Sequence, residues 1–419
     1  MSEIIEMIGT QLPHDWRILT INDLKSDEKY ALSMGPFGSN IKAENFVKSG
    51  IPIIKGTNLN FYRFVGGDFS YLTEEKADEL RSSNCAPLDL VFTHRGTIGQ
   101  VGIVPKGQHD RYVVSQSGMK LAVNKSKVNP FFLLYFFKSR IGQHQLLKNE
   151  SQVGVPSIST PLQSLKEVEV TVPPLPEQES IAELLSSLDD KIELLHRNNH
   201  TLDQIGETIF HRFFLDIQPS TNKLRDYVIT ANTGLDAIKR APIVESETGL
   251  KCLRIQDVSQ EKPLTKWGNT KVESNNFRKS QLKKNDIIMA RTCSPGINYF
   301  VREDLPAVFN NGLVRIRANE EKVYPIFLYY LFKTRDFIGH IDGISGGTSV
   351  QLNMQVGDLL HYDFTFISKQ KQDQLIEQFL DIDNKVLNNN KQIQNLAALR
   401  DALLPKLMTG ELRVKQQAS

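Results

Sequence analysis

The stretch PPLPEQESIAELLSSLDDKIELL, residues 173–195, decides the architecture of this chain. A proline-rich segment leads directly into apolar residues spaced alternately four and three apart, a mean period of about 3.5 residues. The pattern continues to residue 213, and it returns over residues 375–407. About five heptads of this kind are typical of a coiled coil rather than of a helix lying on a globular core.

The two predicted rods are each about 36 residues long, which at about 1.5 Å per residue corresponds to roughly 54 Å. Because they match in length within one chain, they most simply pair with each other, in either orientation. A helix of another protein is the competing partner. Asn199 and Asn389 interrupt the apolar seam, and polar residues at such positions fix register at a cost in stability. The apolar seam residues are Ile181, Leu185, Leu188, Ile192, Leu195, Leu202, Leu375, Phe379, Ile382, Val386, Ile393 and Leu396.

Each rod lies at the end of a sequence repeat of about 195 residues, and the chain contains two copies of this repeat. The copies align NPFFLLYFFKSR (129–140) with YPIFLYYLFKTR (324–335), EQESIAELLSSLDDKI (177–192) with KQDQLIEQFLDIDNKV (371–386), and LDLVFTHRGTIG (88–99) with NDIIMARTCSPG (285–296). Solenoid repeats are much shorter and need three or more copies. The chain is therefore a tandem duplication of a lobe followed by a long helix.

Within each lobe, short apolar segments are separated by glycine, proline and asparagine, which predicts a β-rich α+β fold. The two aromatic segments begin at or just after a proline and are interpreted as short buried helices. The predicted ranges are a first lobe (1–172), a first helix (173–217), a second lobe (218–368) and a second helix with its tail (369–419).

Composition places the chain among soluble globular proteins of more than one domain: it has 419 residues, 40% of them hydrophobic and 23% charged. No apolar run approaches the ~18 residues that span a bilayer, and the first residues include acids where a signal peptide would be basic. Cys85, Cys252 and Cys293 lie far apart, which favours buried thiols over a disulfide framework or a zinc site. We expect a cytoplasmic location.

The charge is unevenly distributed along the chain. Residues 174–217 hold three basic and nine acidic residues, a net charge of −6, whereas residues 218–369 carry +5 and residues 1–173 carry +2. This distribution suits lobes that meet a polyanion and a rod that does not.

The motifs that could carry catalysis each have a simpler interpretation. NPFF (129–132) is similar to the N-P-P-[YF] of adenine methyltransferases but lacks the second proline, so it indicates a helix start beside a buried aromatic residue. His196 and His200 have zinc-ligand spacing without the glutamate of H-E-x-x-H, which favours a solvated helix face. Asp189 and Asp190 are interpreted as surface carboxylates.

The glycine-rich segments GTIGQVG (96–102) and GISGGTSV (343–350) lack the spacing of phosphate loops and are interpreted as turns. We find no Ser-His-Asp or Cys-His set and no metal site, and we expect no catalysis by this chain.

Taken together, these motifs resemble the specificity (S) subunit of type I restriction–modification systems over nearly the whole chain. The resemblance rests on the order of MGPFGSNIK (34–42), GIPIIKGTNL (50–59), DLVFTHRGTIG (89–99), VPPLPEQESIAELLSSLDDKI (172–192), TGLDAIKRAPIVESETGLKCLRIQDVS (233–259) and LLPKLMTGELRV (403–414), and on the half-chain repeat.

The resemblance implies a non-catalytic subunit of a defence system against foreign DNA. Each lobe would be a target recognition domain for one half of a split, asymmetric double-stranded DNA site. The two helices would form an antiparallel coiled coil that spaces the halves. Two modification (M) subunits, which hold S-adenosylmethionine and methylate adenine at N6, would dock on the chain. Restriction (R) subunits, which use ATP and magnesium, would join them.

Under this resemblance, candidate DNA contacts are polar or basic loop residues beside glycine, where backbone can approach a phosphate. These are Gly35, Phe37, Ser39, Asn40, Lys42, Lys55, Asn58, Arg95 and Thr97 in the first lobe, and Lys239, Arg240, Arg254, Asp257, Arg291 and Thr292 in the second. Arg95 and Arg291 are nearly aligned in the repeat, and either could bind phosphate or guanine.

Three departures set expectations of their own. RTCSPG (291–296) replaces the R-G-T-x-G of the first lobe, and KQKQDQ (369–374) replaces PPLPEQ, so the second helix should begin less stiffly. Pro405 falls inside the second heptad run and should kink or end that helix.

Other functions remain open at this point. The chain could be an S-like subunit of a different modification–cleavage system, a coiled-coil scaffold that binds no DNA, or a stand-alone methyltransferase, which would have to bind S-adenosylmethionine.

Overall fold

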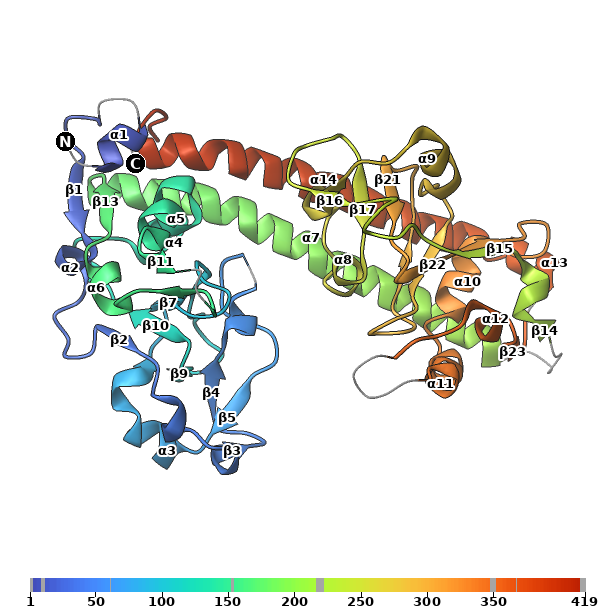
Figure 1. Cartoon of the computed structure of the whole chain (residues 1–419), viewed down its shortest axis with the longest axis horizontal. Helices are drawn as coiled ribbons and strands as arrows, with labels where there is room; N and C mark the ends of the chain where they lie inside the picture. Colours follow the sequence, from blue (N-terminus) through green and yellow to red (C-terminus); the bar gives the residue numbers. More distant parts are fainter. Residues whose placement is uncertain are drawn as a thin grey trace. The chain divides into compact units, whose positions relative to one another are not determined.

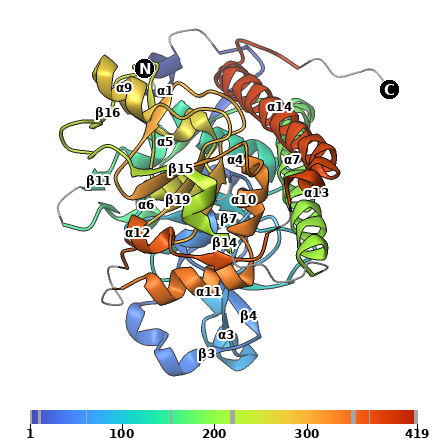
Figure 2. The same ribbon diagram turned by 90° about the vertical axis from the view of Figure 1, so that its right-hand side faces the viewer.

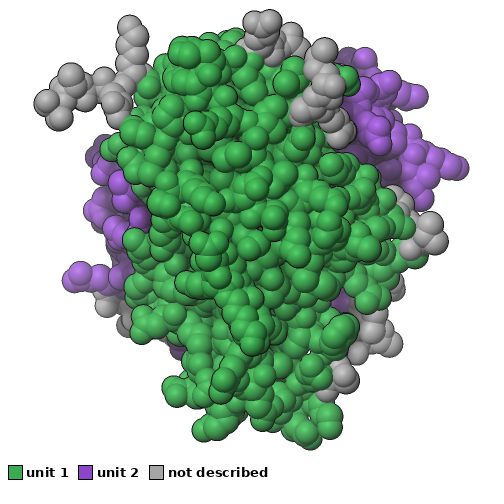
Figure 3. Space-filling view, turned by 90° about the vertical axis from the view of Figure 1, so that its left-hand side faces the viewer, with its two compact units in different colours: residues 1–191, 396–419 green, residues 192–395 purple. Residues whose placement is uncertain are grey.

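The computed structural model describes residues 3–8, 12–60, 62–151, 154–215, 222–346, 352–366 and 368–414. The chain forms two compact units, residues 1–191 with 396–419 and residues 192–395, coloured separately in Figure 3. Each unit takes in one lobe and a segment of each long helix, α7 (Leu175–Leu215) and α14 (Ile376–Thr409). In the described part of the chain, no helix is both long and apolar enough to span a bilayer.

The lobe of the first unit contains two main sheets that pack around separate apolar clusters. One is antiparallel, in the order β2 (Leu32–Met34), β10 (Gly118–Leu121), β7 (Leu90–Thr93), β8 (Val101–Ile103). The other has the order β3 (Phe46–Val47), β5 (Ser70–Leu72), β4 (Ile51–Ile54), β9 (Tyr112–Val114), β6 (Asn84–Cys85), with β4 and β9 parallel. In Figure 1 this second sheet lies at the end of the unit away from α7 and α14.

The remaining elements of this unit are short. Strand β1 (Arg17–Thr20) pairs with β13 (Glu169–Val172), and β11 (Glu150–Ser151) pairs with β12 (Ser157–Ile158). The helices are α1 (Glu3–Ile8), α2 (Ile21–Leu24), α3 (Glu74–Glu79), α4 (Pro130–Lys138), α5 (Arg140–Leu147) and α6 (Pro161–Lys166), with 3₁₀ turns at η1 (Gly38–Asn40), η2 (Ala43–Asn45), η3 (Gly56–Leu59) and η4 (Arg81–Ser83).

The second lobe repeats this topology, except that its second sheet has four strands and lacks a counterpart of β6 among the described residues. Its sheets have the orders β15 (Val228–Thr233), β22 (Leu313–Ala318), β19 (Ile287–Ala290), β20 (Asn298–Phe300) and β16 (Ile243–Val244), β18 (Gly268–Thr270), β17 (Lys251–Leu253), β21 (Ala307–Phe309), and β17 and β21 are again parallel. Strand β14 (Asn222–Lys223) pairs with β23 (Asp363–Phe364). The helices are α8 (Ile255–Ser259), α9 (Ser274–Ser280), α10 (Pro325–Leu331), α11 (Arg335–Ile344), α12 (Val356–Leu359) and α13 (Lys369–Asp373), with 3₁₀ turns η5 (Leu224–Tyr227) and η6 (Leu264–Lys266).

The matching strand orders confirm the α+β duplication predicted from the sequence. The aromatic helices α4 and α10 are buried as predicted, and each begins at a proline. Asn129 caps α4 by accepting a hydrogen bond from the backbone N–H of Phe131 at 2.9 Å, so NPFF is the start of a helix. Full burial of side chains such as Phe132 is worth about 1.5–3 kcal/mol each.

A buried glutamine joins each lobe to the helix that follows it. Gln178 accepts from the backbone N–H of Asn129 at 2.8 Å and donates to the carbonyl of Lys127. In the second copy Gln372 accepts from the N–H of Tyr324 at 3.1 Å and donates to the carbonyl of Lys322. The shared Gln of PPLPEQ and KQKQDQ therefore makes equivalent contacts. The two starts differ in the chain around it, because α7 begins at Leu175 without a break whereas α13 is followed by a separate start of α14.

Helices α7 and α14 lie side by side, as both views show (Figures 1 and 2), and within each unit they are antiparallel. In the first unit Asp189 contacts Arg400, and α7 begins beside the end of the chain, where Glu177 binds Arg413. In the second unit, Asn199 exchanges 2.8 Å hydrogen bonds with Asn389 and Asn390. Further along both helices of the second unit, rings of α7 and α14 meet the same tyrosine of α10, Tyr330.

The predicted seam residues all lie at buried or half-buried positions. Buried are Ile181, Leu185, Leu195, Leu375, Phe379, Ile382, Val386 and Ile393, and half-buried are Leu188, Ile192, Leu202 and Leu396. Ile181 and Leu185 also belong to the core of the first lobe, so the heptad face packs on a globular core as well as on a helix. Of the two expectations for Pro405, that it ends the second helix is wrong, since α14 continues to Thr409. That it kinks the helix stays a prediction.

Candidate functional site

In the first lobe, the loops that follow β2, β4, β7 and β9 converge. The segment after β2 lies against the loop between β9 and β10, where an added Cβ on Gly35 would fall 1.8 Å from the carbonyl oxygen of Ser115. The segment after β7 binds the same loop, because the backbone N–H of His94 donates to the carbonyl of Ser117 at 2.9 Å. Gln100 donates to Asn60 after η3 at 2.8 Å. These loops form one surface, which we call the loop cluster of the first lobe.

The second lobe builds an equivalent loop cluster. Gly234 follows β15 as Gly35 follows β2, and its added Cβ would fall 2.2 Å from the carbonyl oxygen of Phe309. Arg291 after β19 donates its backbone N–H to Gly312, in the loop between β21 and β22. In both lobes a residue with a side chain at the glycine position would collide with backbone, so the close approach requires glycine.

A capping turn follows the parallel strand of each cluster. Asn58 accepts from the backbone N–H of Lys55 at 2.9 Å, and Asp257 accepts from that of Arg254 at 3.1 Å. The amide of Asn58 also donates to two backbone carbonyls, and Asp257 forms an ion pair with Arg254. Both acceptors are buried, so we leave Asn58 and Asp257 out of the surface available to a ligand.

Arg95 and Arg291 occupy matching loops but are held differently. The backbone of Arg95 bridges to Ser157, while its side chain is exposed. The guanidinium of Arg291 donates to the carbonyls of Met354 and Asn311 and to Oδ1 of Asn353. Arg291 therefore fixes its loop, and Arg95 is available to a ligand.

The other predicted contact residues fall on the same two clusters. Phe37, Asn40, Lys42 and Thr97 are exposed in the first lobe, as are Lys239 and Arg240 in the second, where Asp236 pairs with Arg240. Gly35 donates its N–H to Gly118, and Lys55 is half-buried with Nζ donating to Ser70. Thr292 is half-buried and bridges to Asn353. The side chain of Ser39 lies outside the described residues.

The sequence reading missed the loops between β9 and β10 and between β21 and β22. VSQSG (114–118) and FNNGL (309–313) occupy corresponding places in the repeat. A short polar turn between two apolar strands was the signal that could have found them.

A second feature missed from sequence is a buried ion network in each unit. The prediction that Asp189 is a surface carboxylate is wrong. It is 6% exposed, accepts from Tyr135 Oη at 2.6 Å and pairs with Arg400 at 2.8 Å. Asp190 is exposed but pairs with the buried Arg63. Arg400 stands at a seam position, where heptad counting expects an apolar residue.

The repeat places Lys138 and Lys333 at equivalent positions in opposite electrostatic settings. Burial lowers the pKa of Lys138 to about 8; Asp189 opposes the shift and Arg400 adds to it. Burial also disfavours the charged form of Lys333, but Tyr329 and Asp203 outweigh it and raise its pKa above the ordinary value. The difference follows from α7 and α14, which bring an arginine to one lysine and carboxylates to the other.

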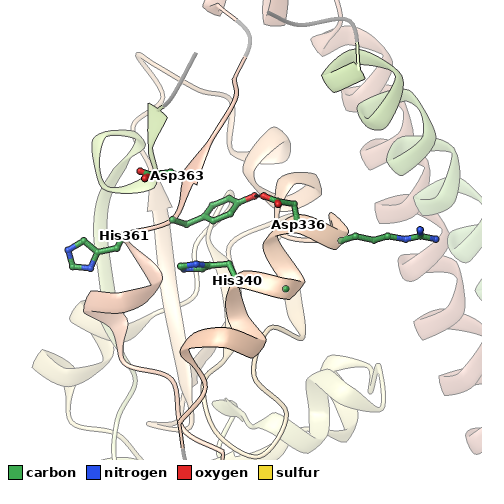
Figure 4. Close-up of a pocket in the computed structure, with 7 residues that line it drawn as sticks. Asp336, His340, His361 and Asp363 are labelled. Atoms are coloured by element: carbon green, nitrogen blue, oxygen red, sulfur yellow. Dashed lines mark hydrogen bonds between the residues drawn. The ribbon is translucent and has the colours of Figure 1, made fainter. Parts of the chain in front are cut away.

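A polar hollow in the second lobe is lined by residues of α11, of the segment between α12 and β23, and of the start of β23. Figure 4 shows Asp336 and His340 from α11 beside His361 and Asp363. Tyr362 donates to Asp336 at 2.5 Å, and its ring lies 5.0 Å from that of His340. Among the described residues, no three His, Cys, Asp or Glu side chains are grouped so that they could hold a metal ion.

On α7, His196 and His200 are exposed, as predicted.

Comparison with known proteins agrees with this geometry. Residues 41–204 match the family model of the type I restriction modification DNA specificity domain. The type I restriction enzyme MjaIX specificity subunit of Methanocaldococcus jannaschii is 24% identical, over 97% of this chain and 95% of that protein. The MjaVIII specificity subunit of the same organism is 22% identical, over 98% and 96%.

Among solved structures, the S subunit of a type I restriction–modification system from M. genitalium has a TM-score of 0.52 at 17% identity. It covers 97% of this chain and 99% of that one, which shows a shared fold. The duplicated lobes, the antiparallel helices and the matched domain lead to one conclusion: the chain contains a type I restriction modification DNA specificity domain, and over nearly its whole length it is similar to type I specificity subunits.

Proposed function

We propose that this chain is the non-catalytic DNA-recognition subunit of a type I restriction–modification enzyme, and that each lobe reads one half of a bipartite, asymmetric DNA site. The observation that carries the proposal is the loop cluster, which is built twice on the same topology but with different side chains. Equivalent placement suits one mode of docking on DNA, and unlike side chains suit two different half-sites.

The helices supply the spacing between the half-sites. With 41 and 34 residues, α7 and α14 correspond to roughly 60 and 50 Å at about 1.5 Å per residue. One turn of B-DNA rises about 34 Å, so helices of this length suit half-sites a turn or more apart. The Asn199–Asn389 contact and the Asp189–Arg400 pair support a fixed register, because a slipped pairing would leave them without partners.

Catalysis belongs to partner subunits in this proposal. Two modification subunits bind S-adenosylmethionine and methylate adenine at N6 in each half-site, and restriction subunits use ATP and magnesium to cleave unmodified DNA. The chain itself binds no cofactor and acts on cytoplasmic DNA.

The test is sequencing of modified bases in the host genome, with and without the gene for this chain. We expect a split motif carrying N6-methyladenine in both halves, which disappears on deletion and returns on complementation. A methylation pattern that does not change on deletion would overturn the proposal.

Two rivals make different predictions. A coiled-coil scaffold would bind the partner proteins but leave every methylated motif intact when its lobes are exchanged. An S-like subunit of another modification–cleavage system would preserve the split motif but co-purify with a different nuclease. Exchange of residues 15–170 for another lobe should change one half-site only.

A further inference from the structure

The loop clusters each present a large apolar side chain to solvent. Phe37 is 82% exposed, and Ile238 is 85% exposed. Both follow the close-packed glycine of their lobe, Phe37 two residues after Gly35 and Ile238 four residues after Gly234. Exposing an apolar side chain so fully is unfavourable by roughly 1.5–3 kcal/mol relative to burial. One such residue is common on a protein surface, but here both lobes place one in the turn that follows the close-packed glycine.

Turns closed by hydrogen bonds keep Phe37 and Ile238 exposed to solvent. The turn after Phe37 is closed by a 2.8 Å hydrogen bond from the N–H of Asn40 to the carbonyl of Phe37. In the second lobe Asp236 accepts from the N–H of Lys239 at 2.7 Å and pairs with Arg240. The apolar tips therefore stand on turns fastened by hydrogen bonds.

Cationic and polar groups flank both tips. Asn40 and Lys42 are exposed beside Phe37, and Lys239 and Arg240 directly follow Ile238. Lys42 and Arg240 also have a carboxylate nearby, Glu44 and Asp236. An apolar tip flanked by cationic side chains fits nucleic acid better than a protein surface, because the cations can hold the backbone while the apolar group reaches the bases.

We propose that Phe37 and Ile238 are specificity-determining wedges, each inserting at a base step of its own half-site. This inference rests on the proposed function and states how each lobe would recognise its half-site. Partial unstacking is cheapest at flexible pyrimidine–purine steps, so the wedge reads sequence through deformability as well as contact. The aromatic Phe37 can also stack on the base that it displaces, which Ile238 cannot do.

The experiment uses the full chain bound to its methyltransferase subunits and duplexes that carry the motif found by sequencing. 2-Aminopurine replaces one base at a time, and its fluorescence rises where stacking is broken. We expect a rise at one step in each half-site. Phe37→Ala should remove one signal and keep the other, Ile238→Ala should do the reverse, and each should weaken binding roughly tenfold or more.

The controls separate the possible outcomes. Ile229→Ala removes an exposed apolar side chain (67% exposed) outside the cluster and should change neither signal. Unchanged affinity and fluorescence in both wedge variants would overturn the inference, as would weaker binding with no fluorescence rise at any step. Loss of assembly with the methyltransferase would instead identify the tips as a protein contact and also overturn it. If no split motif exists, the proposed function itself fails.

Discussion

The buried pair formed by Asp189 and Arg400 should make the first unit sensitive to the loss of either partner. The side chains are each 7% exposed and lie 2.8 Å apart. Removing one partner of a buried pair typically costs 3–5 kcal/mol, because the other charge stays buried. In Asp189→Ala, Arg400 keeps a contact with Asp401, whose side chain is 48% exposed. Tyr135 loses its 2.6 Å acceptor and keeps the longer 3.4 Å bond to Ser186. We therefore expect a cost near the lower end, about 3 kcal/mol.

The matched control is Glu303→Ala. Glu303 pairs with Lys391 at 3.1 Å, and the two side chains are 42% and 51% exposed. Exposed pairs contribute about 0–1 kcal/mol, so this variant should lose less than about 1 kcal/mol. Adding Arg400→Met to Asp189→Ala should recover part of the loss, since no buried charge then remains unpaired.

Hydrogen exchange of backbone amides under increasing urea is the suitable assay. It reports the opening free energy of each unit separately, whereas a single unfolding curve assumes that both open together. If Asp189→Ala and Glu303→Ala lose equal stability, or if the double variant is no better than the single one, the reasoning about the buried pair is refuted.

The remaining predictions concern the lysines, the asparagines and the arginines. Lys138→Met should stabilise the first unit at pH 7, because the lowered pKa of Lys138 means that its charged form destabilises the native state. This destabilisation is fully present below about pH 8 and disappears as the pH rises toward about 10.4, the pKa of lysine in the unfolded chain. The stability gained by the variant, measured by urea titration, should therefore shrink over that pH range. Lys333→Met should destabilise the second unit, because it removes the cation that pairs with Asp203. If both lysine variants change stability in the same direction, the two opposite pKa shifts are contradicted. Replacing Asn199, Asn389 and Asn390 by Leu should raise stability but allow methylation of sites with a wider range of spacer lengths between the half-sites. If the range of spacer lengths does not change, these asparagines do not fix the helix register. Arg95→Gln should weaken DNA binding and lower its salt dependence without loss of stability, whereas Arg291→Gln should also lower the melting temperature of the second unit.

The sequence predicted elements whose cause is local or periodic. The heptad spacing around Ile181 and Phe379 indicated the helices, Pro130 and Asn129 marked a helix start, and the repeat located the second copy of each. The heptad period shows which face of a helix is apolar, and the same face is the one that is buried in the folded protein.

The sequence could not predict contacts decided by tertiary packing. Asp189 carries the same signature as a surface carboxylate, and only the approach of Arg400 from α14 makes it a buried partner. Asn58 resembles an exposed loop amide, yet its carbonyl and amide close a turn. The opposite pKa shifts of Lys138 and Lys333 have the same origin, since both lie in nearly identical local sequence.

In the proposed function, the two lobes read DNA at a distance fixed by the paired helices. Deleting residues 192–198 of α7 together with residues 391–397 of α14 removes one heptad from each and keeps Asn199, Asn389 and Asn390. At about 1.5 Å per residue this shortens the helices by roughly 10 Å, equivalent to about three base pairs. Sequencing of modified bases should then show the same two half-sites with a spacer about three base pairs shorter. Unaltered spacing in an active complex would contradict the claim.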